Sequence, residues 1–213
     1  MEEKRKSEKA PLIYAIVGVA VLIVAVAGST FAFFTASDAA ENAITGETLD
    51  IDLGVTVTKV SGNGTKGEGL IPIHDGTTSG STSQLQAAAT ANCIDKNNYT
   101  ACQIYKITLT NGGADATTVD TTIEFDSATM SNYQHLKWAP MTGAKQMGTG
   151  TFAASTTAAE IFSDVTLAGT AVEQYVMVYV NNTGADQTSQ DHGTFNGTIR
   201  VTASTGAQVQ ASF

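Results

Sequence analysis

Basic residues are scarce in this 213-residue sequence, which has 11 Lys and Arg against 20 Asp and Glu. Four of the basic residues and three of the acidic ones precede Leu12, so the rest of the chain carries a net charge near −10. Nucleic acid and anionic membrane surfaces repel a chain of this charge. The scarcity of positive charge therefore argues against nucleic-acid binding and is typical of a soluble protein outside the cell.

Residue patterns that support catalysis are also lacking. The three histidines, His74, His135 and His192, are isolated, and none belongs to an H-E-x-x-H metal motif. No G-x-S-x-G motif marks a nucleophilic serine. Asp50 and Asp52 are more typical of a solvated strand face than of a cation site. We predict no catalytic residue, no metal ligand and no cofactor, and so a protein that is not an enzyme.

Only two cysteines are present, Cys93 and Cys102, with eight residues between them. In an exported protein this spacing favours a disulfide over a metal site or a nucleophile. Closing so short a loop stabilises a fold by roughly 2–3 kcal/mol on the chain-entropy model. We expect the bridge to fasten a local excursion of the chain. An LPxTG-like motif is absent as well, so covalent attachment to a cell wall by sortase is not expected.

One long uncharged run organises the N-terminal part of the chain. Residues 12–34 (LIYAIVGVAVLIVAVAGSTFAFF) carry no charge and follow a segment that contains Lys4, Arg5, Lys6 and Lys9. As a helix this run would extend about 34 Å, enough to cross a bilayer core of about 30 Å. The positive charges before it keep the N-terminus of the precursor in the cytoplasm.

The end of this run resembles a signal-peptide cleavage site. Thr30 and Ala32 are small residues at the −3 and −1 positions of a cut between Ala32 and Phe33. Cleavage there would make residues 1–32 a signal peptide. Two alternatives remain open, a cut after Ala36 and retention of the whole run as a membrane anchor. All of them place the rest of the chain outside the cell, either secreted or on the cell surface.

Alternating apolar residues predict a mostly β chain beyond the run. Strands are predicted at residues 49–57, 70–73, 102–110, 119–125, 134–138, 172–181, 195–203 and 209–213. Residues 172–181 are apolar on both faces and are expected at the centre of a sheet. Residues 83–92 are the one helix candidate, residues 160–167 fit either a helix or a strand, and the Gly-rich or Thr-rich stretches 61–69 and 142–157 are predicted loops. The fold class is all-β, an antiparallel sandwich with one short helix, preceded by an N-terminal hydrophobic helix.

The tyrosines and the tryptophan beyond position 98 admit two interpretations. They are simplest as core and cross-strand packing, although a carbohydrate groove would use the same residue types. They are Tyr99, Tyr105, Tyr133, Trp138, Tyr175 and Tyr179. By contrast, Phe33 and Phe34 have no local residues that would bury them.

Three segments together resemble a known family. Residues 28–34 (GSTFAFF) end the apolar run, residues 46–51 (GETLDI) follow a short polar stretch, and residues 193–202 (GTFNGTIRVT) lie near the end. They are similar to the TasA/camelysin family of exported biofilm-matrix fibre proteins and to archaeal bundling pilins. In that family a G-T-aromatic-A-x-F region marks cleavage by a dedicated signal peptidase, and a G-T-L-D-type strand opens the mature domain. The present sequence has one extra residue in the second motif.

The resemblance implies a jelly-roll-like domain, residues 49–213, that polymerises head to tail. In the family, the mature N-terminus fills a groove in the next subunit by donor-strand complementation, which is strand addition to an open sheet. Residues 33–48 would be this donor segment, with contacts from Phe33, Phe34, Ala36, Ala40 and Ile44. The expected partners are further copies of the chain and a signal peptidase, and the membrane only through the uncleaved helix.

Two other functions stay open as alternatives to a filament or biofilm-matrix subunit. The chain would be a membrane-anchored surface or adhesion domain if the hydrophobic helix is retained. Some camelysin-type members are described as metalloproteases, although this sequence has no recognisable zinc motif.

Overall fold

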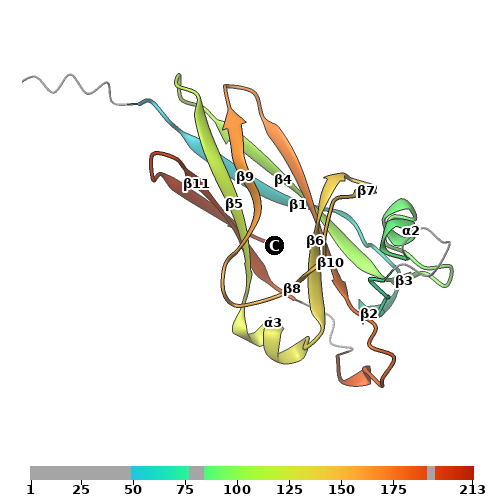
Figure 1. Ribbon diagram of the computed structural model, residues 1–213. Coiled ribbons are helices and arrows are strands. Elements are labelled where there is room, and N and C mark those ends of the chain that lie inside the picture. The colour runs from blue at the N-terminus through green and yellow to red at the C-terminus, as the bar shows by residue number, and fades with distance from the viewer. Residues whose placement is uncertain (1–48, 77–83, 191–194) are drawn as a thin grey trace, which may run out of the picture. The chain divides into compact units, whose positions relative to one another are not determined.

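The chain folds into two antiparallel sheets in a computed structural model, which describes residues 49–76, 84–190 and 195–213 (Figure 1). The strand order of the first sheet is β1 (Leu53–Ser61), β4 (Cys102–Asn111), β10 (Val172–Val180), β6 (Leu136–Gly143) and β7 (Gln146–Met147), and β8 (Phe152–Ala153) also pairs with β6. The order of the second sheet is β12 (Gln208–Ser212), β11 (Gly197–Ala203), β5 (Thr117–Phe125) and β9 (Ala159–Leu167). Two short strands, β2 (Lys66–Leu70) and β3 (Tyr99–Thr100), pair with each other in parallel.

The main hydrophobic core lies between the two sheets. Every second side chain of β5 and of β11 is buried, which is the period of a strand with one face on a core. Ile123 of β5 and Ile199 of β11 pack in the same cluster as Ile107 of β4 and Val178 of β10. The predicted antiparallel β-sandwich is therefore confirmed for the described residues.

The strand β10 lies between β4 and β6, which confirms the central position expected from its apolar sequence. Val176 and Val178 face the core between the sheets, whereas Met177 and Tyr179 belong to a second buried cluster on the outer face. The helix α2 (Gln84–Thr90), predicted from its alanines, covers that outer face with Leu85, which is only 1% exposed. The first sheet is thus buried on both sides along its central strands.

A second helix, α3 (Ser127–Asn132), shows that the prediction of a single short helix was wrong. It has six residues, too few to display an apolar period in the sequence. Its start is fixed by Asp126, whose Oδ1 accepts a hydrogen bond from the backbone N–H of Thr129 at 2.6 Å. Hydrogen bonds from Thr129 hold the pKa of Asp126 below its usual range. A short 3-10 helix, η1 (Thr188–Gln190), follows β10.

The boundaries of several strands differ from those predicted. The alternation from residue 49 predicts a strand there, but β1 begins at Leu53 because its partner β4 ends opposite it at Asn111. The backbone N–H groups of Asp50 and Asp52 instead donate to the side chains of Asp115 and Asn111. Leu49 therefore remains 55% exposed.

Two stretches predicted as loops contain strands. The stretch 61–69 includes most of β2, and the stretch 142–157 includes β7 and β8, which pair with the two ends of β6. The strands β7 and β8 have only two residues each, which is too short for an alternating pattern to be recognised in a sequence rich in Gly and Thr. The ambiguous stretch 160–167 lies within a strand, β9, and β6 extends beyond residue 138 to Gly143.

Candidate functional site

The residues that sequence reasoning assigned to export and assembly lie outside the described part of the chain. They are the predicted cleavage junction, Ala32 and Phe33, and the donor residues Phe33, Phe34, Ala36, Ala40 and Ile44. Among the described residues, no helix is both long enough and apolar enough to cross a membrane. The described strands include the sheet edges to which a donor segment from another subunit could add.

The predicted disulfide between Cys93 and Cys102 is present, with the two Cα atoms 4.8 Å apart. It joins the end of α2 to the start of β4, and both cysteines are fully buried in the outer cluster. Asn92 and Cys93 adopt positive φ angles of 57° and 61°, and the N–H of Cys93 donates to the carbonyl of Ala88 at 2.7 Å. This left-handed turn ends the helix, and the bridge fixes it against the first sheet.

Strand edges are the part of a β-sandwich that another chain can extend. On one side of this sandwich, β1 and β12 contact each other. At the opposite edge of the second sheet, β9 pairs only with β5 (Figure 1). Ile161 and Val165 of β9 pack against the core yet remain partly exposed. Partly exposed apolar residues also occur on β1 and β12, but those two strands contact each other, so β9 is the edge of the second sheet that has no such neighbour among the described strands.

The edge strand β9 is irregular. Its pairing with β5 is interrupted by two register shifts, and Asp164 has a φ of 53°. The N–H of Asp164 donates to Oδ1 of Asp120 at 2.9 Å, so this group points back toward β5. Such irregularities restrict which strands can pair with an edge.

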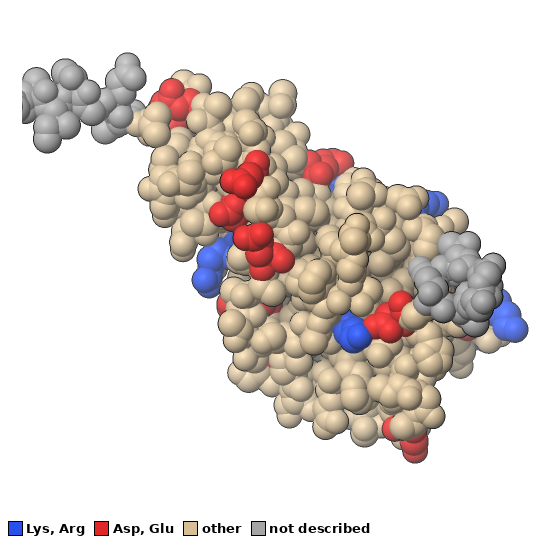
Figure 2. Space-filling model, in the orientation of Figure 1, with Lys and Arg blue, Asp and Glu red and all other residues tan. Residues whose placement is uncertain are grey.

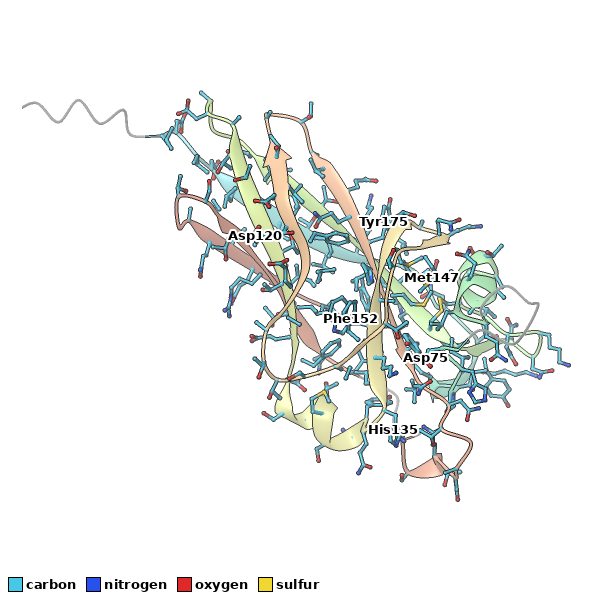
Figure 3. The ribbon with its side chains drawn as sticks, viewed as in Figure 1. Asp75, Asp120, His135, Met147, Phe152 and Tyr175 are labelled. Carbon is cyan, nitrogen blue, oxygen red and sulfur yellow. A yellow bond between two sulfur atoms is a disulfide. The ribbon has the colours of Figure 1, made fainter. Side chains whose placement is uncertain are left out.

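A stacked aromatic pair lies on the strands that lead into β9. The rings of Trp138 on β6 and Phe152 on β8 are 4.5 Å apart between centroids and 22° from parallel (Figure 3). Trp138 is 2% exposed, whereas Phe152 is 46% exposed. Phe152 is thus an exposed aromatic surface that the sequence did not single out, because it lies in a stretch that was predicted as a loop.

Acidic side chains cover the outer face of the second sheet. Figure 2 shows them gathered over β5 and β9, where Asp120, Glu160 and Asp164 are exposed and Glu124 is partly exposed. Within the described ranges, no three His, Cys, Asp or Glu side chains lie close enough together to hold a metal ion. His74 and His135 are far apart in the sequence and lie in loops, and His192 lies outside the described residues.

Two buried tyrosines make the fold sensitive to alkali. Burial raises the pKa of Tyr105 and of Tyr179 above the usual value near 10. The hydroxyl of Tyr105 donates to Oε1 of Gln103 at 2.6 Å, and that of Tyr179 donates to Oδ2 of Asp75 at 3.4 Å. Because the unfolded chain ionises first, stability is unaffected below about pH 10 and falls as the pH rises further.

We therefore expect the variant Tyr105→Phe to lose stability less steeply than the wild type above pH 10. Chemical denaturation at several pH values between 8 and 11 measures this slope. A buried phenol contributes up to about 1.4 kcal/mol per pH unit, so removing that of Tyr105 should make the slope shallower by up to this amount. An unchanged slope in the variant would show that Tyr105 ionises equally in the folded and unfolded chains.

No protein-family model matches this chain, and no curated protein matches it in sequence. Among solved structures, it is similar to the crystal structure of a FixG-related protein from Vibrio parahaemolyticus. The TM-score is 0.31 and the sequence identity 7%, over 76% of this chain and 92% of that one. A likeness of this size carries no functional argument.

Proposed function

We propose that this chain is a structural subunit of an extracellular filament or biofilm-matrix fibre. In this proposal it polymerises head to tail by donor-strand complementation after its signal peptide is removed. The observation that carries the proposal is the order of segments: a basic start, a long uncharged run, a polar stretch with unpartnered aromatics, and then a β-sandwich. Residues 1–32 form the signal peptide with its hydrophobic helix, residues 33–48 the donor segment and residues 49–213 a jelly-roll-like domain.

The open edge of β9 supports the acceptor half of this proposal. A donor strand paired there would cover Ile161 and Val165, which the sandwich itself leaves partly exposed. Phe152 lies on the strand before β9 and adds an exposed apolar surface. Main-chain hydrogen bonds provide affinity in strand addition, and side-chain pockets fix the register. The irregular pairing of β9 would favour one register over others.

The apolar residues of the donor segment supply the driving force. Burying each of Phe33 and Phe34 contributes roughly 1.5–3 kcal/mol. This gain must exceed the cost of ordering the segment and joining two subunits, so neither residue is dispensable. In the precursor, the membrane helix holds the segment and prevents insertion, so cleavage acts as the switch for assembly.

The proposal predicts that substituting the donor residues abolishes filaments. In the exported chain, we expect the double variant Phe34→Ser, Ile44→Ser to yield folded monomers and no filaments in electron micrographs. The variant leaves Ala32 and Phe33 unchanged, so the predicted cleavage junction is intact. The matched control is Val60→Ser, which removes an apolar side chain that is 38% exposed on β1 and should leave filaments unchanged. Normal filaments from the double variant would refute the donor role.

Mixing the double variant with the wild-type chain gives a second, independent measurement, the length of the filaments. The double variant keeps its acceptor edge, so it should cap growing ends and shorten filaments of the wild-type chain even at a low molar fraction. N-terminal sequencing of the extracellular protein completes the test. A start at Phe33 supports the filament subunit, whereas an intact Met1 supports the membrane-anchored surface domain instead.

A further inference from the structure

A pocket of about 400 Å³ lies between the end of β2, the strand β3 and the loop after β10. This volume falls within the range of about 300–1,000 Å³ that is usual for small-molecule sites. Its lining combines an apolar part with a polar part. The lining includes Leu70, Pro72, Tyr99, Asn182, Asp186 and Gln190.

The apolar side of the pocket is held in place by the strands β3 and β10. The N–H of Ile71 donates to the carbonyl of Thr100 at 2.8 Å, and the N–H of Ile73 donates to that of Val180 at 2.9 Å. Leu70 is buried in the main core and is 5% exposed. Asp75 then accepts hydrogen bonds from Lys137 and Tyr179, which fasten the end of this segment to β6 and β10 (Figure 3).

The polar side is held by hydrogen bonds within the loop after β10. Oδ1 of Asn182 accepts from the N–H of Gly184 at 2.8 Å, and Oδ1 of Asp186 accepts from the N–H of Thr188 at 3.0 Å. Oε1 of Gln190, which is 6% exposed, accepts from the N–H of His135 at 3.0 Å. Each of these side chains therefore has one oxygen committed to the fold and a fixed position.

The remaining polar atoms of the same side chains are available to a ligand. The amide nitrogens of Asn182 and Gln190 are donors, the second oxygen of Asp186 is an acceptor, and the hydroxyl of Tyr99 is both. No hydrogen bond joins the two amide nitrogens or the Tyr99 hydroxyl to another described residue, whereas the carboxylate of Asp186 also has a side-chain hydrogen bond to Thr188. Tyr99 is 38% exposed, so one part of its ring is open to solvent beside Pro72.

This combination narrows the chemistry of the ligand. The carboxylate of Asp186 and the net charge of −9 disfavour an anion. A single carboxylate is too little for a Ca²⁺ site, which takes six to eight oxygen ligands. A purely apolar ligand would leave the donors and acceptors unsatisfied. An exposed aromatic ring next to fixed amides and a carboxylate suits a ligand with an apolar face and several hydroxyl groups.

We propose that this pocket is a binding site for a neutral saccharide unit, with one sugar ring against Tyr99 and its hydroxyl groups on Asn182, Asp186 and Gln190. The volume accommodates a mono- or disaccharide. The inference goes beyond the filament function, because it gives the chain a ligand other than a further copy of itself. It does not depend on assembly, since every lining residue named belongs to one domain.

The test begins with the purified full chain in mild detergent on an array of immobilised neutral mono- and disaccharides, including maltose, cellobiose and N,N′-diacetylchitobiose. The best-bound sugar is then titrated calorimetrically. We expect Tyr99→Ala to weaken binding at least tenfold and Tyr99→Phe to change it by less than about threefold, because the ring face rather than the hydroxyl provides most of the contact. Phe152→Ala, which removes an exposed aromatic outside the pocket, should leave binding unchanged.

A second variant guards against a folding defect in Tyr99→Ala. Ala185 is exposed at the rim, so Ala185→Trp obstructs the pocket without removing an internal hydrogen bond, and it should abolish binding with an unchanged melting temperature. The proposal is overturned if no neutral sugar binds above the level of Ala185→Trp. It is equally overturned if Phe152→Ala weakens binding as much as Tyr99→Ala does.

Discussion

Replacing Trp138 by alanine is expected to lower the free energy of unfolding by about 3–5 kcal/mol. Its side chain is 2% exposed and packs in the core between the sheets, with Phe152 stacked against it. The substitution removes this buried surface and leaves a cavity next to β6, which neighbouring side chains fill only in part. Guanidinium denaturation followed by far-ultraviolet circular dichroism measures the change, since Trp138 is the sequence's single tryptophan and fluorescence is lost with it.

The matched control for this prediction is Phe152→Ala. Its ring forms the other half of the stack but is 46% exposed, so its loss should cost well under half as much. Comparable losses from the two substitutions would contradict the view that the buried member of the pair provides the stability. They would show instead that Phe152 is covered in solution.

Removing the disulfide with Cys93→Ala and Cys102→Ala together is expected to cost about 2–3 kcal/mol. The effect should be local because the bridge closes a short loop between α2 and β4 and lies outside the core between the sheets. With alanine at position 93 the positive φ still costs about 1–3 kcal/mol, and the bridge no longer holds this turn in place. Amide hydrogen exchange should therefore accelerate in α2 more than in any strand of the second sheet.

The control for this experiment is chemical reduction of the wild-type protein, which should reproduce the exchange pattern of the double variant. Exchange that accelerates equally in α2 and in β11 would contradict a local role. It would mean that the bridge limits unfolding of the whole sandwich.

The sequence predicted those elements whose pattern is both long and regular. The strands β5 and β11 show it, because a buried face repeats every two residues over seven or more positions, and β10 shows it as an apolar run that is buried on both faces. Elements that depend on a partner were missed. The strands β7 and β8 exist only because β6 offers them an edge, and α3 depends on the hydrogen bonds of Asp126.

The sequence and the structure contribute to different parts of the candidate sites. The disulfide followed from spacing and expected location, and the structure confirms it. The donor segment and its cleavage remain predictions, because residues 33–48 lie outside the described part. The pocket at Tyr99 was not predictable, since its walls come from three stretches separated by about 30 and 80 residues in the chain. For Tyr99, core or cross-strand packing was the simpler of the two interpretations of the sequence, but its side chain is 38% exposed.

The pairing of β1 with a single neighbour has a mechanical consequence. β1 runs antiparallel to β4 from Leu53, opposite Asn111, to Ser61, opposite Ile104. A force applied to the N-terminal end of β1, at Leu53, and directed along the strand axis loads all the hydrogen bonds between β1 and β4 at once, in shear. The same force applied across the strand would break them one after another. The rupture force under tension should therefore depend on the direction of pulling and on the length of β1 more than on the equilibrium stability of the domain.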